Sequence, residues 1–248
     1  MTRYVRSLNA AYTCNSLRMG LSLGLVVIGL GFLGCAENTE ERIDAVYAAK
    51  AEPSAENVEI IRGFLTDPDR DVRATAVNSL VSLEVPDAAD VAEAALQDPD
   101  GFVRSIAAMR MGDVGTASHV SLLVQLLAND PDKIVRQRAA ESLSMLGGEE
   151  SIAGLMTGLG DPLDNVRLAA ARGVRALDAS PAIPQLSRML LEDPIWEIRV
   201  QAASALGSTG DPDVLAVLES ALEDDNEFVR SAASNALRVH RAVEDATP

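Results

Sequence analysis

The segment DPDRDVRATAVNSL at residues 67–80 recurs as DPDGFVRSIAAMRM at 98–111 and as DPDKIVRQRAAESL at 130–143. These copies open with an Asp-Pro pair, as do two of three further copies, the last of which has Asp224-Asp225. In all of them an arginine that follows a β-branched residue comes six residues after the aspartate. An alanine and then a large apolar residue follow the β-branched residue at intervals of four, which is the spacing of one helical face. Such self-similarity is the sequence signature of a repeat protein.

The motif occurs six times with a period of 31 or 32 residues, so it fills most of the chain. Its arginines are Arg73, Arg104, Arg136, Arg167, Arg199 and Arg230. The aspartates six residues earlier are Asp67, Asp98, Asp130, Asp161, Asp193 and Asp224. We place the repeats at residues 55–85, 86–115, 116–148, 149–179, 180–210 and 211–241.

Each unit is predicted to form two helices joined by the Asp-Pro turn. The proline disfavours helical backbone at the preceding aspartate and so ends the first helix. The second helix carries the apolar stripe of Val72, Ala76 and Leu80 and their equivalents. The first helix carries a column eight residues before the arginine: Leu65, Leu96, Ala128, Leu159, Leu191 and Leu222. One helix pair cannot bury its stripe alone, so the pairs must stack around a shared core, and the predicted fold class is all-α.

The Asp-Pro turn, the Val-Arg pair and the alanine and leucine on one stripe together resemble the HEAT repeat. The short unit is similar to the phycobilisome-lyase type of HEAT-like repeat. The resemblance covers residues 55–241 and implies an α-α superhelix, a right-handed solenoid of six two-helix repeats. It also implies a structural ladder, in which the arginine of one repeat bonds the aspartate of a neighbour and the turn backbone; an anion-binding row is the functional alternative. It implies little about activity, since one fold hosts many functions.

Composition agrees with helices and argues against some functions. Aromatic residues make up only 3% of the chain, and alanine and leucine dominate the apolar set, which favours helix over strand. The net charge of -16 gives no electrostatic route to a phosphate backbone, so no nucleic-acid partner is expected. Both cysteines, Cys14 and Cys35, lie near the N-terminus, so the repeats hold no thiol for a disulfide or a zinc site.

The N-terminus has the layout of a secretory signal peptide, predicted over residues 1–34. Three arginines and no acidic residue precede an apolar run that ends just before Cys35. As a helix this run would span about 21 Å, short of the roughly 30 Å of a bilayer core. The stretch Phe32-Leu33-Gly34-Cys35 resembles a bacterial lipobox, which implies lipidation of Cys35 with fatty acids such as palmitate. A plain cleaved signal and an uncleaved anchor are the alternatives.

The resemblance to lipoproteins also implies a location. Ala36 after the cysteine argues against inner-membrane retention, so we expect an anchor in the outer membrane facing the periplasm, with the lipid as the sole membrane contact. Residues 35–54 are predicted to hold the lipidated cysteine, a tether and a capping helix over 38–50, started by Asn38. Residues 242–248 are predicted to be an unstructured tail.

The sequence contains two features that resemble metal sites, an acidic motif and a pair of histidines. Asp67, Asp69 and Asp71 form the D-x-D-x-D that opens a calcium loop, but the glycine and the closing glutamate of such a loop are missing, so helix capping is expected instead. Some HEAT-like relatives are di-iron hydroxylases with paired His-Glu motifs, whereas His119 and His240 are followed by valine and arginine. His119 is expected to be a solvated or edge residue rather than a ligand.

We therefore expect no catalytic residue, no metal, no cofactor and no enzymatic activity. Export would also separate the chain from the substrate of bilin lyases, the other enzymes of this resemblance. The predicted function is a protein–protein interaction scaffold or adaptor. An enzyme or small-ligand binder of the bilin-lyase-related type is the alternative.

The partner is predicted to be a protein, bound along the concave groove that the second helices line in HEAT arrays, by a monomer of this chain. An exposed column on those helices is predicted to comprise Asn78, Met109, Glu141, Arg172, Ser204 and Asn235. Three aromatic residues, Phe102, Trp196 and Phe228, stand at the starts of these helices. We take Trp196, Arg172, Met109 and Glu141 as the candidate partner-binding residues, because aromatic and arginine side chains often carry interface energy. The alternative is that Phe102 and Phe228 staple adjacent repeats.

Overall fold

The structure is a computed structural model that describes residues 38–246, with side chains described as far as His240. Cys35 and the predicted signal peptide lie outside the described residues. The chain divides into two compact units with the boundary between Ser79 and Leu80, and each is described by itself.

The first unit contains α2 (Thr39–Ala51), α3 (Ala55–Gly63), a 3-10 turn η1 (Phe64–Thr66) and the start of α4 (Arg70–Ser82). Asn38 caps α2, because its side chain accepts a hydrogen bond of 2.9 Å from the backbone N–H of Glu41. Ser54 caps α3 in the same way through Asn57. Both caps satisfy backbone donors that a helix start leaves unpaired.

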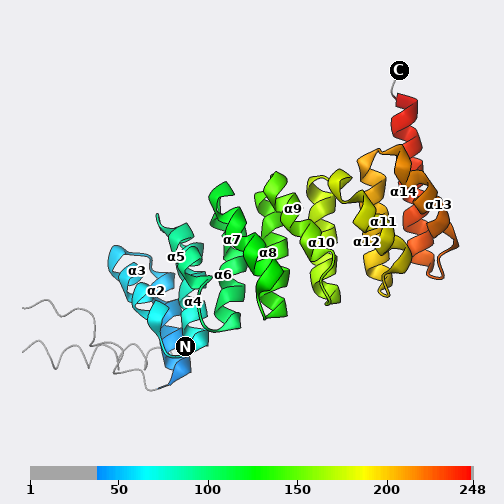
Figure 1. The fold of residues 1–248 in the computed structure, drawn as a ribbon. Coiled ribbons are helices and arrows are strands. Elements are labelled where there is room, and N and C mark those ends of the chain that lie inside the picture. Colours follow the sequence, from blue (N-terminus) through cyan, green and yellow to red (C-terminus); the bar gives the residue numbers. More distant parts are fainter. Residues whose placement is uncertain (1–37, 247–248) are drawn as a thin grey trace, which may run out of the picture. The chain divides into compact units, whose positions relative to one another are not determined.

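The second unit continues the alternation of first and second helices (Figure 1). Its first helices and their flanking 3-10 turns are α5 (Ala88–Ala95), η2 (Ala117–His119) with α7 (Val120–Asn129), α9 (Glu149–Gly158), η3 (Ser180–Ala182) with α11 (Ile183–Glu192), and η4 (Pro212–Val214), α13 (Leu215–Ser220) and η5 (Ala221–Glu223). Its second helices are α6 (Gly101–Val114), α8 (Lys133–Leu146), α10 (Asp164–Leu177), α12 (Trp196–Thr209) and α14 (Glu227–Ala246). Each second helix packs on the next one along the chain.

The core is built from the columns that the sequence repeats. The β-branched and alanine columns are fully buried in every repeat, as Val135 and Ala139 illustrate. Leu80, Met111, Leu143, Val174 and Leu206 are also fully buried. Burial of one such side chain contributes about 1.5–3 kcal/mol, so stacking of the pairs is the main source of stability. Residues 38–246 form thirteen α-helices and no strand, and the prediction of an all-α solenoid of two-helix repeats is confirmed.

The predicted column on the first helices is only partly correct. Leu96 and Leu159 are buried, whereas Leu65 is half-buried and Ala128, Leu191 and Leu222 are exposed. The reason is where the helical backbone ends: in α7, α11, η1 and η5 it runs up to the residue before the aspartate, while α5 and α9 end earlier and are followed by two turn residues. Where the helix continues to the aspartate, the buried position falls one residue earlier, at Phe64, Leu127, Leu190 and Ala221.

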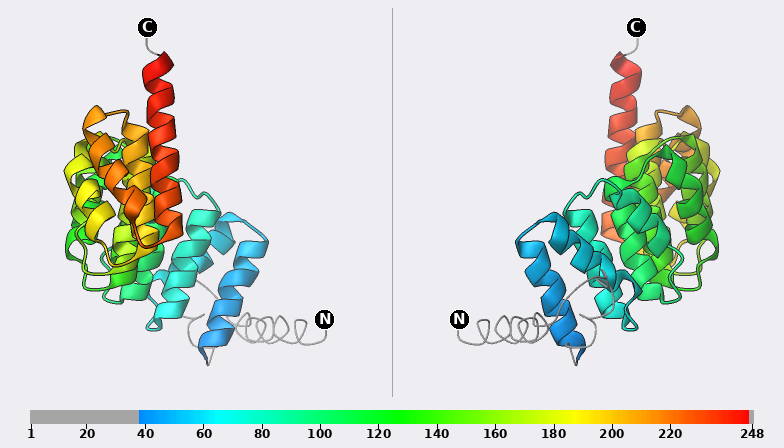
Figure 2. Two further views of the ribbon diagram at one scale, coloured as in Figure 1. Left: turned by 90° about the vertical axis from the view of Figure 1, so that its right-hand side faces the viewer. Right: turned by 90° about the vertical axis from the view of Figure 1, so that its left-hand side faces the viewer.

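The C-terminal helix is longer than predicted. The sequence predicts a tail without structure after Arg241, but α14 runs to Ala246, and its last turns project beyond the preceding helices (Figure 2). Alanine, valine and glutamate after Arg241 are compatible with a helix, and the next helix-breaking residue is Pro248. Among residues 38–246 no helix is both long and apolar enough to cross a bilayer.

Candidate binding face and the aspartate-arginine ladder

Each repeat turns at its aspartate through the same local hydrogen bond. In the third repeat, Oδ1 of Asp130 accepts a hydrogen bond of 2.8 Å from the backbone N–H of Asp132. The aspartates of the other repeats make the same bond to the residue two positions on, at 2.8–3.0 Å. This side-chain turn satisfies a backbone donor at the point where the proline has ended the first helix.

The arginine of the same repeat closes the turn and also reaches the next repeat. Nη1 of Arg136 donates to the backbone carbonyl of Asp130 at 2.8 Å. Its Nε and Nη2 donate to the two carboxylate oxygens of Asp161 at 2.7 and 3.1 Å. The two side chains are only 12% and 7% exposed. Bidentate, charge-assisted bonds of this kind are among the stronger ones in proteins.

Five successive repeats are joined in this way by four pairs, Arg104–Asp130, Arg136–Asp161, Arg167–Asp193 and Arg199–Asp224. The hydrogen bond that each guanidinium group donates to its partner aspartate raises the pKa of all four arginines, against the opposing effect of burial. Each aspartate therefore closes its own turn with Oδ1 and anchors the arginine of the preceding repeat. The arrangement links neighbouring repeats, and it engages these arginine and aspartate side chains in hydrogen bonds within the protein.

The first unit shows a rung that the repeat pattern does not reveal. Arg42, on α2, forms an ion pair with Asp67, with Nε and Oδ2 3.0 Å apart but without hydrogen-bond geometry. It stands where the arginine of a preceding repeat would stand. Nη1 of Arg73 donates to the Asp67 carbonyl at 2.8 Å, as in the other repeats.

The last rung differs from the others. Nη1 of Arg230 donates to the carbonyls of Asp224 and Asp225 at 2.7 and 3.0 Å. Among the side chains described, which end at His240, it has no carboxylate partner, and its own side chain is exposed. The ladder therefore ends at Arg230.

The acidic motif and the first histidine serve as caps. Asp69 accepts hydrogen bonds from the Asp71 N–H and, at 2.7 Å, from the Thr39 hydroxyl, and the Thr39 bond is the main reason for its lowered pKa. His119 is 9% exposed, so it is not solvated, and its Nδ1 accepts a hydrogen bond of 3.0 Å from the Thr116 N–H in a capping box. In the described part of the chain, no group of three or more His, Cys, Asp or Glu side chains is placed to hold a metal ion.

The solvent-facing side of the second helices in the second unit, called here the second-helix face, carries exposed apolar side chains at the helix starts. They are Phe102 on α6, Ile134 on α8, Trp196 on α12 and Phe228 on α14. The rings of Trp196 and Phe228 stack with centroids 5.1 Å apart and an angle of 28° between their planes. Even in this stack, Trp196 is 37% exposed and Phe228 55% exposed. The stack joins adjacent repeats, as the alternative interpretation of Phe228 expects, but the sequence does not predict Trp196 as its partner.

The four candidate partner-binding residues do not form one cluster. Arg172 is exposed, and it has no ion pair within the described residues. Glu141 accepts hydrogen bonds from Arg138 and Gln137, so its carboxylate is engaged, and Met109 is half-buried. Arg172 is the ninth residue of α10 whereas Trp196 is the first residue of α12, a difference of about 12 Å along the helix axes.

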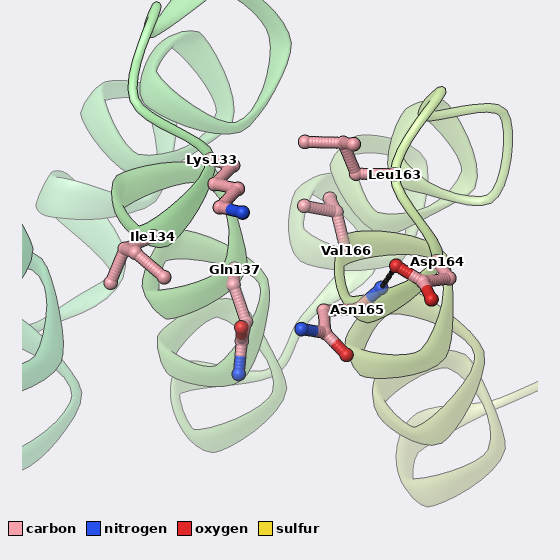
Figure 3. Close-up of a pocket in the computed structure, with 7 residues that line it drawn as sticks. All are labelled: Lys133, Ile134, Gln137, Leu163, Asp164, Asn165 and Val166. Atoms are coloured by element: carbon pink, nitrogen blue, oxygen red, sulfur yellow. Dashed lines mark hydrogen bonds between the residues drawn. The ribbon is translucent and has the colours of Figure 1, made fainter.

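A shallow hollow lies between the starts of α8 and α10 on the same face (Figure 3). It has an empty volume of about 250 Å³ that includes open solvent, and it is lined by Lys133, Ile134, Gln137, Leu163, Asp164, Asn165 and Val166. Apolar and polar side chains from both helices border it. It is a depression in the face and not an enclosed pocket.

The repeats of this chain match a known protein family. The family model for HEAT repeats matches residues 33–112, 92–175 and 152–238, which together cover most of the chain. The chain belongs to the HEAT-repeat family. The ladder and the stacked helix pairs described above are the HEAT repeats of this protein. HEAT- and armadillo-like solenoids commonly bind protein partners.

The proteins similar to this chain include an enzyme. An uncharacterised phycocyanin operon protein Z from Pseudanabaena tenuis is 29% identical over 154 residues, covering 58% of this chain and 75% of that protein. A deoxyhypusine hydroxylase from Eremothecium gossypii is 33% identical over 120 residues, covering 47% of this chain and 37% of that enzyme. The crystal structure of YibA from Escherichia coli matches with a TM-score of 0.58 and 22% identity, over 81% of this chain and 77% of that one, and shows the shared fold.

These relatives correct one expectation from the sequence. The prediction that the chain has no enzymatic activity is wrong as an inference from this fold, because HEAT-repeat relatives include a hydroxylase. HEAT repeats are a framework that enzymes and binding proteins share.

Proposed function

We propose that this HEAT-repeat protein is a scaffold that binds a protein partner on its second-helix face. The observation that carries the proposal is the set of exposed apolar side chains at the helix starts, Phe102, Ile134, Trp196 and Phe228. Their contribution to the core is small, since the buried columns of the same helices already fill it. Exposed aromatic side chains on one face are a frequent mark of an interaction site.

Site-specific photo-crosslinking in cells tests this face. A benzoylphenylalanine in place of Phe102 or Phe228 is expected to capture the partner. Leu191 offers a matched control, because it is an exposed apolar residue, 54% accessible, on the first helix α11. Adducts at the first two positions but not at Leu191 support the proposal, and equal adducts at all three contradict it.

The contribution of the predicted binding residues is tested by Trp196→Ala combined with Arg172→Ala. The double variant should weaken capture of the partner, while helical content and the melting temperature stay nearly unchanged, since both side chains are exposed. Full binding by the double variant, or its unfolding, would show that these residues are not the contact.

We also propose that a lipid on Cys35 anchors the scaffold in the outer membrane of the bacterial cell envelope. The support is the sequence alone: an apolar run that follows three arginines and ends just before Cys35. Cys35→Ser should abolish labelling by radioactive palmitate and release the protein from the membrane fraction. Cys14→Ser, which alters the other cysteine, is the control and should leave both unchanged.

An enzymatic role is the second candidate, supported by the 33% identity with a deoxyhypusine hydroxylase. That match spans 37% of the enzyme's length. Incubation of the purified protein with iron(II), oxygen and a peptide that carries deoxyhypusine tests it directly. Gain of one oxygen atom by the peptide, measured by mass spectrometry, would favour this candidate.

A further inference from the structure

The Trp196–Phe228 stack lies in a patch whose other members are glutamates. On α12 the aromatic residue is followed by Glu197, and on α14 it is preceded by Glu227. When the two repeats are aligned, Trp196 corresponds to Glu227 and Glu197 corresponds to Phe228. Each aromatic residue therefore has a glutamate as its counterpart on the other helix. Both glutamates are exposed, and neither forms an ion pair within the described residues. We call Trp196, Glu197, Glu227 and Phe228 the aromatic-acid patch.

The charge around this patch is strongly negative. Residues 192–230 contain ten acidic residues and two basic ones. Both basic residues are engaged: Arg199 bonds to Asp224 and Asp225, and Arg230 bonds to turn carbonyls. By contrast, residues 131–175 contain six acidic and six basic residues. The stretch of sequence that holds the stacked rings therefore carries a large excess of negative charge.

Aromatic faces and carboxylates attract the same kind of group. The face of an indole or phenyl ring attracts a cation, with Trp the strongest, and the interaction is worth about 0.5–1 kcal/mol at exposed sites. A glutamate beside the ring adds an ion pair. The net charge of the chain, -16, steers positively charged partners toward it over longer distances.

We infer that the aromatic-acid patch binds a lysine- or arginine-bearing segment of the protein partner, with its cation against the Trp196–Phe228 rings and between Glu197 and Glu227. This inference rests on the proposed function, because it names the chemistry of the partner at one end of the same face. An acidic segment is disfavoured here, since it would meet two unpaired carboxylates and no free cation among the described residues of the patch.

The patch contains its own reporter, because Trp196 is the single tryptophan of the chain. Titration of the purified protein with a short peptide of alternating lysine and serine should change the Trp196 emission in a saturable way. Salt should weaken the effect, since the glutamates are exposed. Peptides that alternate glutamate or glutamine with serine should have no comparable effect at millimolar concentration.

Paired variants separate local recognition from overall charge. Glu197→Gln with Glu227→Gln should weaken binding of the lysine peptide about threefold to tenfold, as expected for two exposed ion pairs. Glu149→Gln with Glu150→Gln changes the net charge equally, but at the start of α9, and should change the affinity less than about twofold. Circular dichroism spectra identical to that of the parent protein would show that both double variants are folded.

Each outcome decides the inference. An unchanged Trp196 emission with the lysine peptide, equal binding of the glutamate peptide, or equal losses in the two double variants would overturn it. Crosslinks at Phe102 and Phe228 without a lysine-dependent change would leave the scaffold function standing and make the cationic partner wrong. Failure of both experiments would make both proposals wrong.

Discussion

The interior of the ladder and its last rung use the same residue types but hold them differently. Arg136 is nearly buried, closes its own turn and makes a bidentate pair with Asp161 of the next repeat. Arg230 closes its own turn and has no carboxylate beyond it within the described residues. The turn bond thus belongs to the single repeat, whereas the ion pair belongs to the junction between repeats. Stability should therefore depend on position in the array, even for identical motifs.

The largest expected effect breaks an interior junction. Arg136→Ala should lower the free energy of unfolding by about 2–4 kcal/mol, because it strands the nearly buried carboxylate of Asp161. Arg230→Ala removes only turn bonds of an exposed side chain and should cost about 1 kcal/mol or less. Urea unfolding followed by circular dichroism measures both. Equal losses in the two variants would contradict the distinction between turn and junction.

A second prediction concerns how closely the last two second helices approach. A Cβ at Gly207 on α12 would lie 2.5 Å from the Ala236 Cβ and 2.8 Å from its Cα on α14, so the backbone would have to move. Gly207→Ala should lower the free energy of unfolding by about 1–3 kcal/mol. Gly63→Ala is the control, because a Cβ there meets nothing within 4 Å and the backbone is helical, so a gain of up to about 1 kcal/mol is expected. Equal thermal melting of the two variants would contradict this packing.

The smallest effect tests the charge of the last complete rung. The hydrogen bond from Arg199 lowers the pKa of Asp224, so the folded state binds a proton there less readily than the unfolded chain. The resulting stability is present above the unfolded pKa and is lost as the pH falls through the folded value. Asp224→Asn should lower the free energy of unfolding by about 1 kcal/mol at neutral pH, because Asp225 still contacts Arg199. The stability of this variant should also fall less steeply than that of the parent protein below about pH 4.

Urea midpoints at a series of pH values measure this effect. Asp225→Asn is the matched control, because the Asp225 side chain is 91% exposed and should contribute little. A pH profile of Asp224→Asn that parallels the parent protein would show that the rung does not contribute to acid unfolding.

The sequence predicts the repeats well because the four junctions of the second unit use the same atoms in the same register. The period of 31 or 32 residues follows from the arginine column alone. Arg42 is missed because it belongs to α2, which lies outside the repeated units and shares no other column with them. Its position before Asp67 becomes meaningful only when α2 is placed beside the first turn.

The binding face is harder to predict because it depends on how neighbouring helices are offset. Trp196 and Phe228 occupy different columns of the repeat, so an alignment does not bring them together, yet their rings stack. The exposure of Leu191 depends similarly on whether the helix continues up to the residue before the aspartate. Single-residue rotations of this kind are not visible in an average period.

The shared aspartate at each junction also makes the number of repeats adjustable. Deletion of residues 131–161, one full period, would join Asp130 directly to Pro162 and restore the Asp-Pro turn. Arg104 would keep Asp130 as its partner, and Arg167 would meet the Asp130 carbonyl in place of that of Asp161. The junction rejoins with all of its hydrogen bonds. Gene duplication or loss of whole units can therefore change the length of the array in single steps without inventing a new contact.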